Sequence, residues 1–444
     1  MDTPIYDFLR RYAASDTLRA HMPGHKGKAP VEELRQLYEL DITEIKGADS
    51  LFEAEGIIAE SERNTSALYG SAGSVFSAGG STLCIQAMLT LMKQEGRRII
   101  AVRNVHRAFL NAAALLGLDV EWLMPEYSGG ILSGRLCLTD AEAALAASAQ
   151  PSCLYITSPD YTGRTADTAA LAVLCHRYGA RLIVDNAHGA HLAFLEKNLH
   201  PIALGADMCC DSAHKMLPAL TGGAVLHTSR PEYAVRMKQA MSLFGSTSPS
   251  YLIMASLDLC NRYIAESIRR DIAAALPRIK ELRESLSDRL VFADSEPFHI
   301  TVMAAESGYC GSELAEILRR KGVECEYSDE ELLILLLSPF TAAEDFGRLR
   351  SALESAVSGA SRYEKRNPAF QIKLPKMACA IREAVFAPAE EIPVEKAEGR
   401  ICASVKVPCP PAVPIAVSGE IIDRDCIEVF RAYGIKTVLV VKGS

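Results

Sequence analysis

Short apolar runs alternate with segments of helical length from about residue 70 onward. The apolar runs predict strands over Arg98–Val102, Val120–Leu123, Cys153–Thr157, Arg181–Asp185 and Gly223–His227. The intervening segments predict helices over Thr82–Gln94, Arg107–Leu116 and Thr168–Tyr178. The run Arg181–Asp185 is apolar without alternation, which is typical of a strand buried on both faces. The pattern predicts an α/β fold with a mostly parallel sheet and helices on both of its faces.

The chain on either side of this region follows other patterns. The first 60 or so residues predict an arm with one short helix over Pro4–Tyr12. After Pro249 a helical pattern runs towards Arg289, and Pro277 is expected to interrupt it. A smaller α+β unit is predicted next, with strands Phe298–Ala304, Val323–Tyr327 and Leu332–Leu337 and helices Ser312–Lys321 and Ala342–Ser358. The tail from Arg362 is polar and Pro-rich, and its segment Val407–Pro414 suits neither a helix nor an interior strand.

Composition narrows the class of protein. The 444 residues include 47 Lys and Arg against 55 Asp and Glu, for a net charge of −8, which argues against a nucleic-acid or anionic-membrane surface. No apolar run approaches the roughly 20 residues of a membrane helix, and the N-terminus lacks the apolar core of a signal peptide. None of the thirteen Cys residues is spaced C-x-x-C. We therefore expect a cytoplasmic protein without disulfides, a metal site, nucleic acid or a membrane partner.

Lys215, in CDSAHKMLPALTGG, is the first candidate for chemistry. It follows a predicted buried strand, and a poorly solvated amine has a lowered pKa that favours imine formation with a carbonyl cofactor. Asp185 ends a predicted parallel strand, at the edge where α/β folds bind ligands, and precedes Lys215 by 30 residues. Taken singly, a surface lysine and a helix-capping acid are the ordinary interpretations. Together they suit an imine-forming lysine and the acid that pairs with a pyridinium nitrogen.

The segment SAGGST, Ser77–Thr82, supplies a third element. Its glycines precede a predicted helix, whose first N–H groups could bind a phosphate. An acid, an imine-forming lysine and a phosphate cup together describe a pyridoxal-phosphate (PLP) enzyme. His106 and His188 each follow a predicted strand. His106 could stack on the cofactor ring, and His188 could reach the phenolic oxygen of the cofactor. We expect no metal at His188 and His191 or at His21 and His25, because further ligands at suitable spacing are missing.

With these residues in place, the sequence resembles the ornithine/lysine/arginine decarboxylase family of fold-type I PLP enzymes. The resemblance is to the short bacterial form that lacks the N-terminal wing domain. Its motifs follow the family's order: HMPGHKG (His21–Gly27), Asp41–Ile58, RNVH, SPDYTGR (Ser158–Arg164), DNAHGAH, SAHK, GSTSPSY (Gly245–Tyr251) and the tail Glu395–Glu420. The chain departs from the family at Asn186, where Glu is common, at Arg107-Ala108, and at Cys409 and Ala412 of the tail.

The resemblance implies a role for each matching residue. Lys215 would form the imine, Asp185 would pair with the pyridine nitrogen, and His106 would stack on the ring. The further cofactor-binding residues that it implies are Gly80, Ser81, Thr82, Ala187, His188, Ser212 and His214, with Ser246 and Thr247 reaching the cofactor of a neighbouring subunit. The implied assembly is a homodimer or a higher homo-oligomer with shared active sites. The implied domains are an arm plus PLP-binding large domain (1–265), a small α+β domain (266–361) and a C-terminal decarboxylase-type domain (362–444).

The implied reaction is PLP-dependent α-decarboxylation of a basic amino acid, with arginine ahead of lysine and ornithine, in polyamine metabolism. Lys215 and His214 are both candidate donors of the proton to Cα. Binding of a cationic substrate head requires carboxylates, and the candidates are Glu44, Asp49, Glu53 and Glu420. Two alternatives stay open. One is a fold-type I aminotransferase or acyltransferase, and the other is a non-catalytic regulatory homologue.

Overall fold

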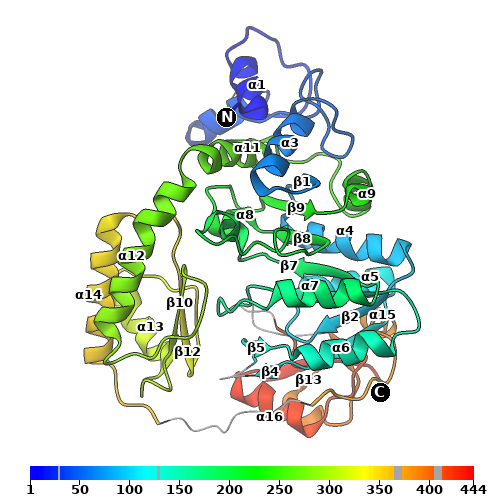
Figure 1. Ribbon diagram of the computed structural model, residues 1–444, viewed down its shortest axis with the longest axis vertical. Helices are drawn as coiled ribbons and strands as arrows, with labels where there is room; N and C mark the ends of the chain where they lie inside the picture. Colours follow the sequence, from blue (N-terminus) through cyan, green and yellow to red (C-terminus); the bar gives the residue numbers. More distant parts are fainter. Residues whose placement is uncertain (29–30, 128–130, 365–372, 405–412) are drawn as a thin grey trace. The chain divides into compact units, whose positions relative to one another are not determined.

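The computed structural model describes the whole chain except residues 29–30, 128–130, 365–372 and 405–412. The chain divides into two compact units, each built from two stretches of sequence (Figure 1). The first comprises Met1–Glu95 with Arg181–Arg270, and the second comprises Gly96–Ala180 with Asp271–Ser444. The domain ranges expected from the sequence, 1–265, 266–361 and 362–444, remain a prediction. Most of the predicted Pro-rich segment Val407–Pro414 lies outside the described residues.

The first unit holds four strands of the main sheet in the order β1-β9-β8-β7. These strands are β1 (Gly73–Ser77), β7 (Arg181–Asp185), β8 (Met208–Asp211) and β9 (Ala224–Thr228). β7 and β8 are parallel, whereas β9 pairs antiparallel with both β8 and β1. The helix α4 (Gly80–Gln94) packs against β8 and β9, and nine of its residues, between Leu83 and Met92, are buried. This packing fixes the N-terminus of α4 beside the end of β8.

The remaining helices of the first unit pack around one another. α1 (Pro4–Ala13) contacts α3 (Ile57–Tyr69) and α11 (Tyr251–Glu266), as Figure 1 shows. Asp258 of α11 accepts hydrogen bonds from the N–H groups of Ile5 and Tyr6, and so caps the first turn of α1. The shorter helices of this unit are α2 (Arg35–Leu40), α8 (Ala213–Met216), α9 (Pro231–Ala234) and α10 (Met237–Ser242). The N-terminal arm is thus a packed part of this unit.

The second unit holds three more strands of the main sheet in the order β6-β2-β3, and both pairs are parallel. These strands are β2 (Arg98–Val102), β3 (Val120–Leu123) and β6 (Ser152–Thr157). The connecting helices are α5 (Arg107–Leu116), α6 (Leu138–Ala147) and α7 (Thr168–Arg177), and a hairpin joins β4 (Glu126–Tyr127) to β5 (Gly134–Arg135). The predicted α/β class with a mostly parallel sheet is therefore confirmed.

A three-stranded antiparallel sheet follows in the same unit, in the order β10-β12-β11. Its elements are β10 (His299–Met303), α13 (Gly311–Arg320), β11 (Tyr327–Ser328), β12 (Leu332–Leu336) and α14 (Ala343–Gly359). The predicted strand Val323–Tyr327 is wrong over most of its length. Only Tyr327 and Ser328 pair with β12, because Val323 instead closes the end of α13 through its N–H bond to Leu318.

The prediction that Pro277 interrupts the long helix is also wrong. The break falls at Ser267, between α11 and α12 (Ile268–Leu286), and Pro277 lies inside α12. A proline in a helix interior costs about 3 kcal/mol. Six apolar side chains of α12 on both sides of the proline are at most 3% exposed: Ile268, Ile272, Ala275, Ile279, Leu282 and Leu286. Burial of this continuous face offsets the cost and keeps the helix whole.

The tail folds into a small sheet with two helices. The strands have the order β13-β15-β14, with β13 (Ala389–Pro393), β14 (Cys402–Ser404) and β15 (Thr437–Val441). α15 (Ile381–Phe386) packs on α5, and α16 (Arg424–Ala432) contributes Phe430 to a buried cluster with Val438 and Val440. In the described part of the chain, no helix has the length and apolar composition that crossing a membrane requires.

Candidate active site

Asp185 lies at the carboxyl edge of the parallel pair β7 and β8, where its partner in register is Cys210. The Asp185 side chain is buried, with 2% exposed. Its Oδ1 atom accepts a hydrogen bond from the N–H of Ala187 at 3.2 Å and from the thiol of Cys210 at 3.7 Å. A buried carboxylate held at this edge is suited to keeping a proton on a ring nitrogen of a ligand.

Lys215 lies on α8, the short helix that follows β8. Its Nζ atom is 2.9 Å from Nε2 of His188, which is itself buried and follows Asp185 by three residues. The expectation that a buried strand would desolvate Lys215 is wrong for the single chain, where Lys215 is exposed. The reason is that β8 ends at Asp211, so the strand does not cover a side chain one helical turn further on.

The N-terminus of α4 carries the residues that are predicted to form a phosphate cup. Gly80 has φ +69°, and a Cβ built on it would meet nothing within 4 Å, so open space lies where a side chain would otherwise be. Ser212 donates a hydrogen bond to Ser81, Oγ to Oγ, at 2.9 Å, which joins the cup to the residue that precedes α8. Thr82 is exposed beside them. Two hydroxyls and the first N–H groups of a 15-residue helix fit a phosphate group.

His214 and the pair Ser246–Thr247 lie in the same unit. The Nδ1 atom of His214 donates to the carbonyl of Gly223 at 2.9 Å, which leaves Nε2 as the ring atom available to a ligand. Ser246 and Thr247 are exposed. Ser246 also lines a cavity of about 230 Å³ together with Gly79 and Thr82. The expectation that this pair serves a neighbouring subunit remains a prediction.

His106 belongs to the second unit, where it forms the N-cap of α5. Its Nδ1 atom accepts a hydrogen bond from the N–H of Ala108 at 3.1 Å, so in the neutral ring the proton is on Nε2. This bond fixes the orientation of the imidazole directly after β2. Its predicted stacking on the cofactor ring remains a prediction.

A buried polar cluster around Asp211, formed with Asn186, His200 and His227, was not predicted from the sequence. Asp211, the last residue of β8, accepts hydrogen bonds from Asn186 Nδ2 at 2.6 Å and from His200 Nε2 at 3.1 Å. His227 Nε2 lies 3.4 Å from the same carboxylate, and its Nδ1 bonds to Ser74 Oγ at 2.8 Å. Because Asn186 follows Asp185 and Asp211 precedes Ser212, the cluster joins the two chain segments that carry the candidate site.

The charges in this cluster are set by burial and by mutual contact. Burial alone would raise the pKa of Asp211, but His200 and His227 together hold it below its usual range. Burial lowers the pKa of His227, although Asp211 opposes this effect. The ligand atoms of His200, Cys209 and Asp211 lie within 4.8 Å of one another, a spacing that could accommodate a metal ion. The hydrogen bonds already described account for these contacts, and the absence of a metal site remains a prediction.

Comparison with protein families identifies the family of this chain. A family model described as Orn/Lys/Arg decarboxylase, major domain, matches residues 3–305, and the model of the C-terminal domain of the same family matches residues 363–434. The chain belongs to the Orn/Lys/Arg decarboxylase family. Membership confirms three predictions from the sequence: the fold-type I architecture, decarboxylase chemistry and PLP as the cofactor.

Similarity to individual proteins extends over nearly the whole chain. The arginine decarboxylase of Bacillus subtilis is 28% identical over 452 residues, which cover 96% of this chain and 92% of that protein. Lysine decarboxylase A from Pseudomonas aeruginosa superposes with a TM-score of 0.82 at 19% identity, covering 99% of this chain and 80% of that chain. An archaeal O-phosphoseryl-tRNA(Sec) selenium transferase superposes with a TM-score of 0.60 at 15% identity, covering 80% of this chain and 90% of that one. At these identities the superpositions show the fold alone.

Two of the four carboxylates expected to bind substrate in this family member are already engaged by the protein. Asp49 accepts hydrogen bonds from the N–H groups of Ser50, Glu55 and Gly56. Burial would raise the pKa of Asp49, but these backbone donors lower it overall. Asp49 thereby stabilises the loop that precedes α3. The other two candidate carboxylates, Glu44 and Glu53, belong to exposed residues.

Glu420 is the second engaged carboxylate. Arg103 binds it through both guanidinium nitrogens, Nη1 to Oε1 at 2.8 Å and Nη2 to Oε2 at 2.6 Å. The N–H of Val417 also donates to Oε2 at 2.7 Å, and both charged side chains are about 1% exposed. Arg103 directly follows β2 and precedes His106 by three residues. The contact therefore joins the decarboxylase-type tail to the segment that carries His106, and we leave Glu420 out of the proposed substrate site.

Proposed function

We propose that this chain catalyses the PLP-dependent α-decarboxylation of arginine to its amine, agmatine, with release of CO₂. The observation that carries the proposal is the Lys215–His188 contact in the same unit as buried Asp185 and the phosphate cup at α4. Arginine is chosen ahead of lysine and ornithine because relatives of 26–28% identity over nearly the whole chain are named arginine decarboxylase.

The residues present fit the cofactor. Gly80, Ser81, Thr82 and Ser212 would bind its phosphate, since hydroxyls and helix N–H groups converge there. Asp185 would keep the pyridine nitrogen protonated, and Lys215 would bind the aldehyde carbon. Ala187 is proposed as a further cofactor-binding residue, and His106 as the residue that stacks on the ring. Bound PLP supplies a ring that accepts the electron pair released from the bond between Cα and the carboxylate.

The chain's own residues then bind, orient and transfer protons. Because Asp185 is buried and bonded to the Ala187 N–H and the Cys210 thiol, its charge stays in one position throughout the reaction. Lys215 is proposed to protonate Cα after CO₂ leaves. His188, in contact with Nζ, can return a proton to that amine. His214, whose Nδ1 is bound to Gly223, is the second candidate donor through its Nε2 atom.

Assembly, location and substrate binding complete the proposal. We infer a homodimer or a higher homo-oligomer in which Ser246 and Thr247 reach the cofactor of a neighbouring subunit. The protein is proposed to act in the cytoplasm, in polyamine metabolism, without nucleic-acid or membrane partners. Glu44 and Glu53, which are exposed on the single chain, are the carboxylates proposed for the guanidinium head of the substrate.

The test is a substrate screen with product identification. Protein purified with added PLP is incubated separately with arginine, lysine and ornithine, CO₂ is trapped, and the organic product is identified by mass spectrometry. The proposal predicts CO₂ and agmatine from arginine at the highest kcat/KM. A keto acid without CO₂ would favour the aminotransferase alternative. No turnover of any of the three, by protein that binds PLP, would favour the non-catalytic alternative.

A further inference from the structure

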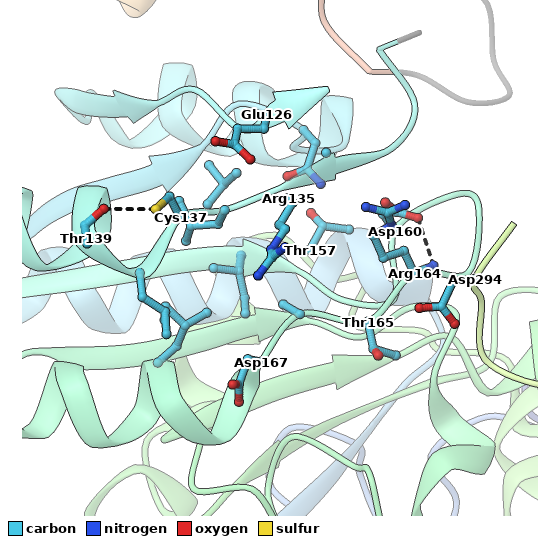
Figure 2. A pocket seen from close by; sticks show the side chains of 18 residues that line it. Glu126, Arg135, Cys137, Thr139, Thr157, Asp160, Arg164, Thr165, Asp167 and Asp294 are labelled. Atoms are coloured by element: carbon cyan, nitrogen blue, oxygen red, sulfur yellow. Dashed lines mark hydrogen bonds between the residues drawn. The ribbon is translucent and has the colours of Figure 1, made fainter. Parts of the chain in front are cut away.

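The second unit contains a cavity of about 660 Å³ at the carboxyl ends of β2 and β6 (Figure 2). In the strand order β6-β2-β3, the chain leaves β2 for β3 on one side and returns to β6 on the other. Ligands of open α/β sheets bind at such reversals of strand order. The cavity has the volume of a small-molecule site, and none of its lining residues is among those proposed above to bind PLP.

Three oxygen atoms of the cavity lining are buried without a partner in the described part of the chain. They are Oδ1 of Asn104, Oγ1 of Thr157 and Oδ2 of Asp160. Asn104 follows β2 and Thr157 ends β6, the parallel neighbour of β2. The other oxygen of Asp160, Oδ1, accepts hydrogen bonds from the N–H and hydroxyl of Thr162 and from the N–H of Arg164. Leaving buried acceptors unpaired costs free energy, so a ligand that donates hydrogen bonds to them is favoured.

A primary ammonium group matches this arrangement. It carries three N–H donors and one positive charge, and the three acceptors include one carboxylate. Asp160 is 3% exposed, and burial raises its pKa. The hydroxyls of Thr162 and Ser133 and the N–H groups of Arg164 and Thr162 partly oppose this shift. A bound cation would replace the water that this carboxylate has lost on burial.

Two guanidinium groups line the same cavity. Arg135 lies on β5, and Arg164 follows the Asp160 loop; Figure 2 shows both side chains in the cavity with Asp160 and Asp294. Neither guanidinium makes a hydrogen bond or an ion pair with any residue that the structure describes. A guanidinium binds a carboxylate through two parallel N–H donors. The cavity therefore offers acceptors for an ammonium group and donors for a carboxylate.

We propose that this cavity is a binding site for a free α-amino acid, with the ammonium group on Asn104, Thr157 and Asp160 and the carboxylate on Arg135 and Arg164. The acidic side chains of Glu126 and Asp294 at the cavity lining would favour an amino acid with a cationic side chain over an acidic one. The site is additional to the proposed function and does not depend on it.

The test is calorimetric titration of borohydride-reduced holoenzyme, in which amino acids can no longer react with the PLP carbonyl. Three probes are compared: L-alanine, ethylammonium and propionate, the last two carrying one half of the zwitterion each. L-alanine is expected to bind saturably with one site per chain, at least about tenfold more tightly than either half. Thr157→Val and Arg135→Gln should each weaken L-alanine binding at least about tenfold, and Arg135→Lys should recover part of the loss.

The matched control is Arg177→Gln, which removes an exposed guanidinium of the same unit that is paired with Glu142 and does not line the cavity. This variant should bind L-alanine as the unmodified protein does, and thermal melting verifies that every variant is folded. Binding that is unchanged in both Thr157→Val and Arg135→Gln would overturn the proposal. So would equal affinity for ethylammonium and L-alanine, or a crystal structure with L-alanine present in which ordered water alone occupies the three acceptors.

Discussion

Lys215 and His188 share a 2.9 Å hydrogen bond between Nζ and Nε2 although they are 27 residues apart. The bond joins α8, which follows β8, to the loop that follows β7. His188 is buried, whereas Lys215 is exposed on the single chain. If Lys215 is the reactive amine, as proposed, the buried imidazole of His188 can exchange a proton with it during turnover.

Replacing His188 tests this relay. His188→Asn is expected to lower kcat for arginine decarboxylation by about 10²-fold, since general acid–base groups contribute 10²–10⁴-fold. Because His188 is also a predicted cofactor contact, PLP content is measured in parallel and kcat is expressed per bound PLP; the pH profile of kcat should change shape. His176→Asn, an exposed histidine on α7, is the control. An unaltered kcat and pH profile in His188→Asn would exclude the relay.

Asp211 is expected to support the site through the cluster that it forms with Asn186, His200 and His227. Asp211→Asn removes the charge between two imidazoles and should lower the free energy of unfolding by about 3–5 kcal/mol, measured by urea titration. Because the folded-state pKa of Asp211 is lowered, its contribution is present above the ordinary carboxyl pKa and is lost as the pH falls below it. The variant should therefore lose less stability than the wild type on acidification below about pH 4. Equal acid sensitivity would contradict this assignment.

Glu62 predicts a pH dependence of the opposite sign. Burial raises the pKa of Glu62 to about 7, although Lys238 and the N–H of Phe76 oppose the shift. A carboxyl with a raised folded-state pKa favours the folded protein when protonated, so this contribution is present below the unfolded pKa and falls as the pH rises towards 7. The loss is expected to be at most about 3 kcal/mol. In Glu62→Gln the unfolding free energy should depend less on pH between about pH 4.5 and 7 than in the wild type. An equally steep pH dependence in the variant would show that Glu62 is not its cause.

The buried Arg103–Glu420 pair predicts a strong coupling energy. Glu420→Ala should cost about 3–5 kcal/mol of unfolding free energy, because it leaves the guanidinium of Arg103 buried without its carboxylate. The double variant Arg103→Met, Glu420→Leu should recover much of that loss, as apolar replacements of buried pairs often do. A double-mutant cycle measures the effect. Additive losses would show that the two residues act separately.

The fold was largely predictable because burial leaves a direct pattern in the sequence. The predicted bounds of β2, β3, β7 and α5 agree with the structure, since each is an apolar strand or an amphipathic helix between clear turns. The break expected at Pro277 does not occur, because the buried face of a 19-residue helix outweighs the local propensity of one proline. Such packing involves residues that only the folded chain brings together.

The candidate site was predictable where a motif marks it. Lys215, Asp185 and the SAGGST segment stand in the family's order, and the structure places His188 against Lys215. The Asp211 cluster could not be found in this way, because His200 comes from a loop and His227 from β9, with no regular spacing to Asp211. The role of Glu420 was equally hidden, since its partner Arg103 lies 317 residues away.

The most direct measurement for the central claim, that PLP acts through Lys215, is the chemical location of the cofactor. Holoenzyme is reduced with borohydride, which fixes PLP to the amine that holds it, and is then digested and mapped by mass spectrometry. We expect a phosphopyridoxyl group on the peptide that contains Lys215, and its loss in Lys215→Ala. Recovery of the group on any other lysine, or on none, would exclude the proposed role of Lys215.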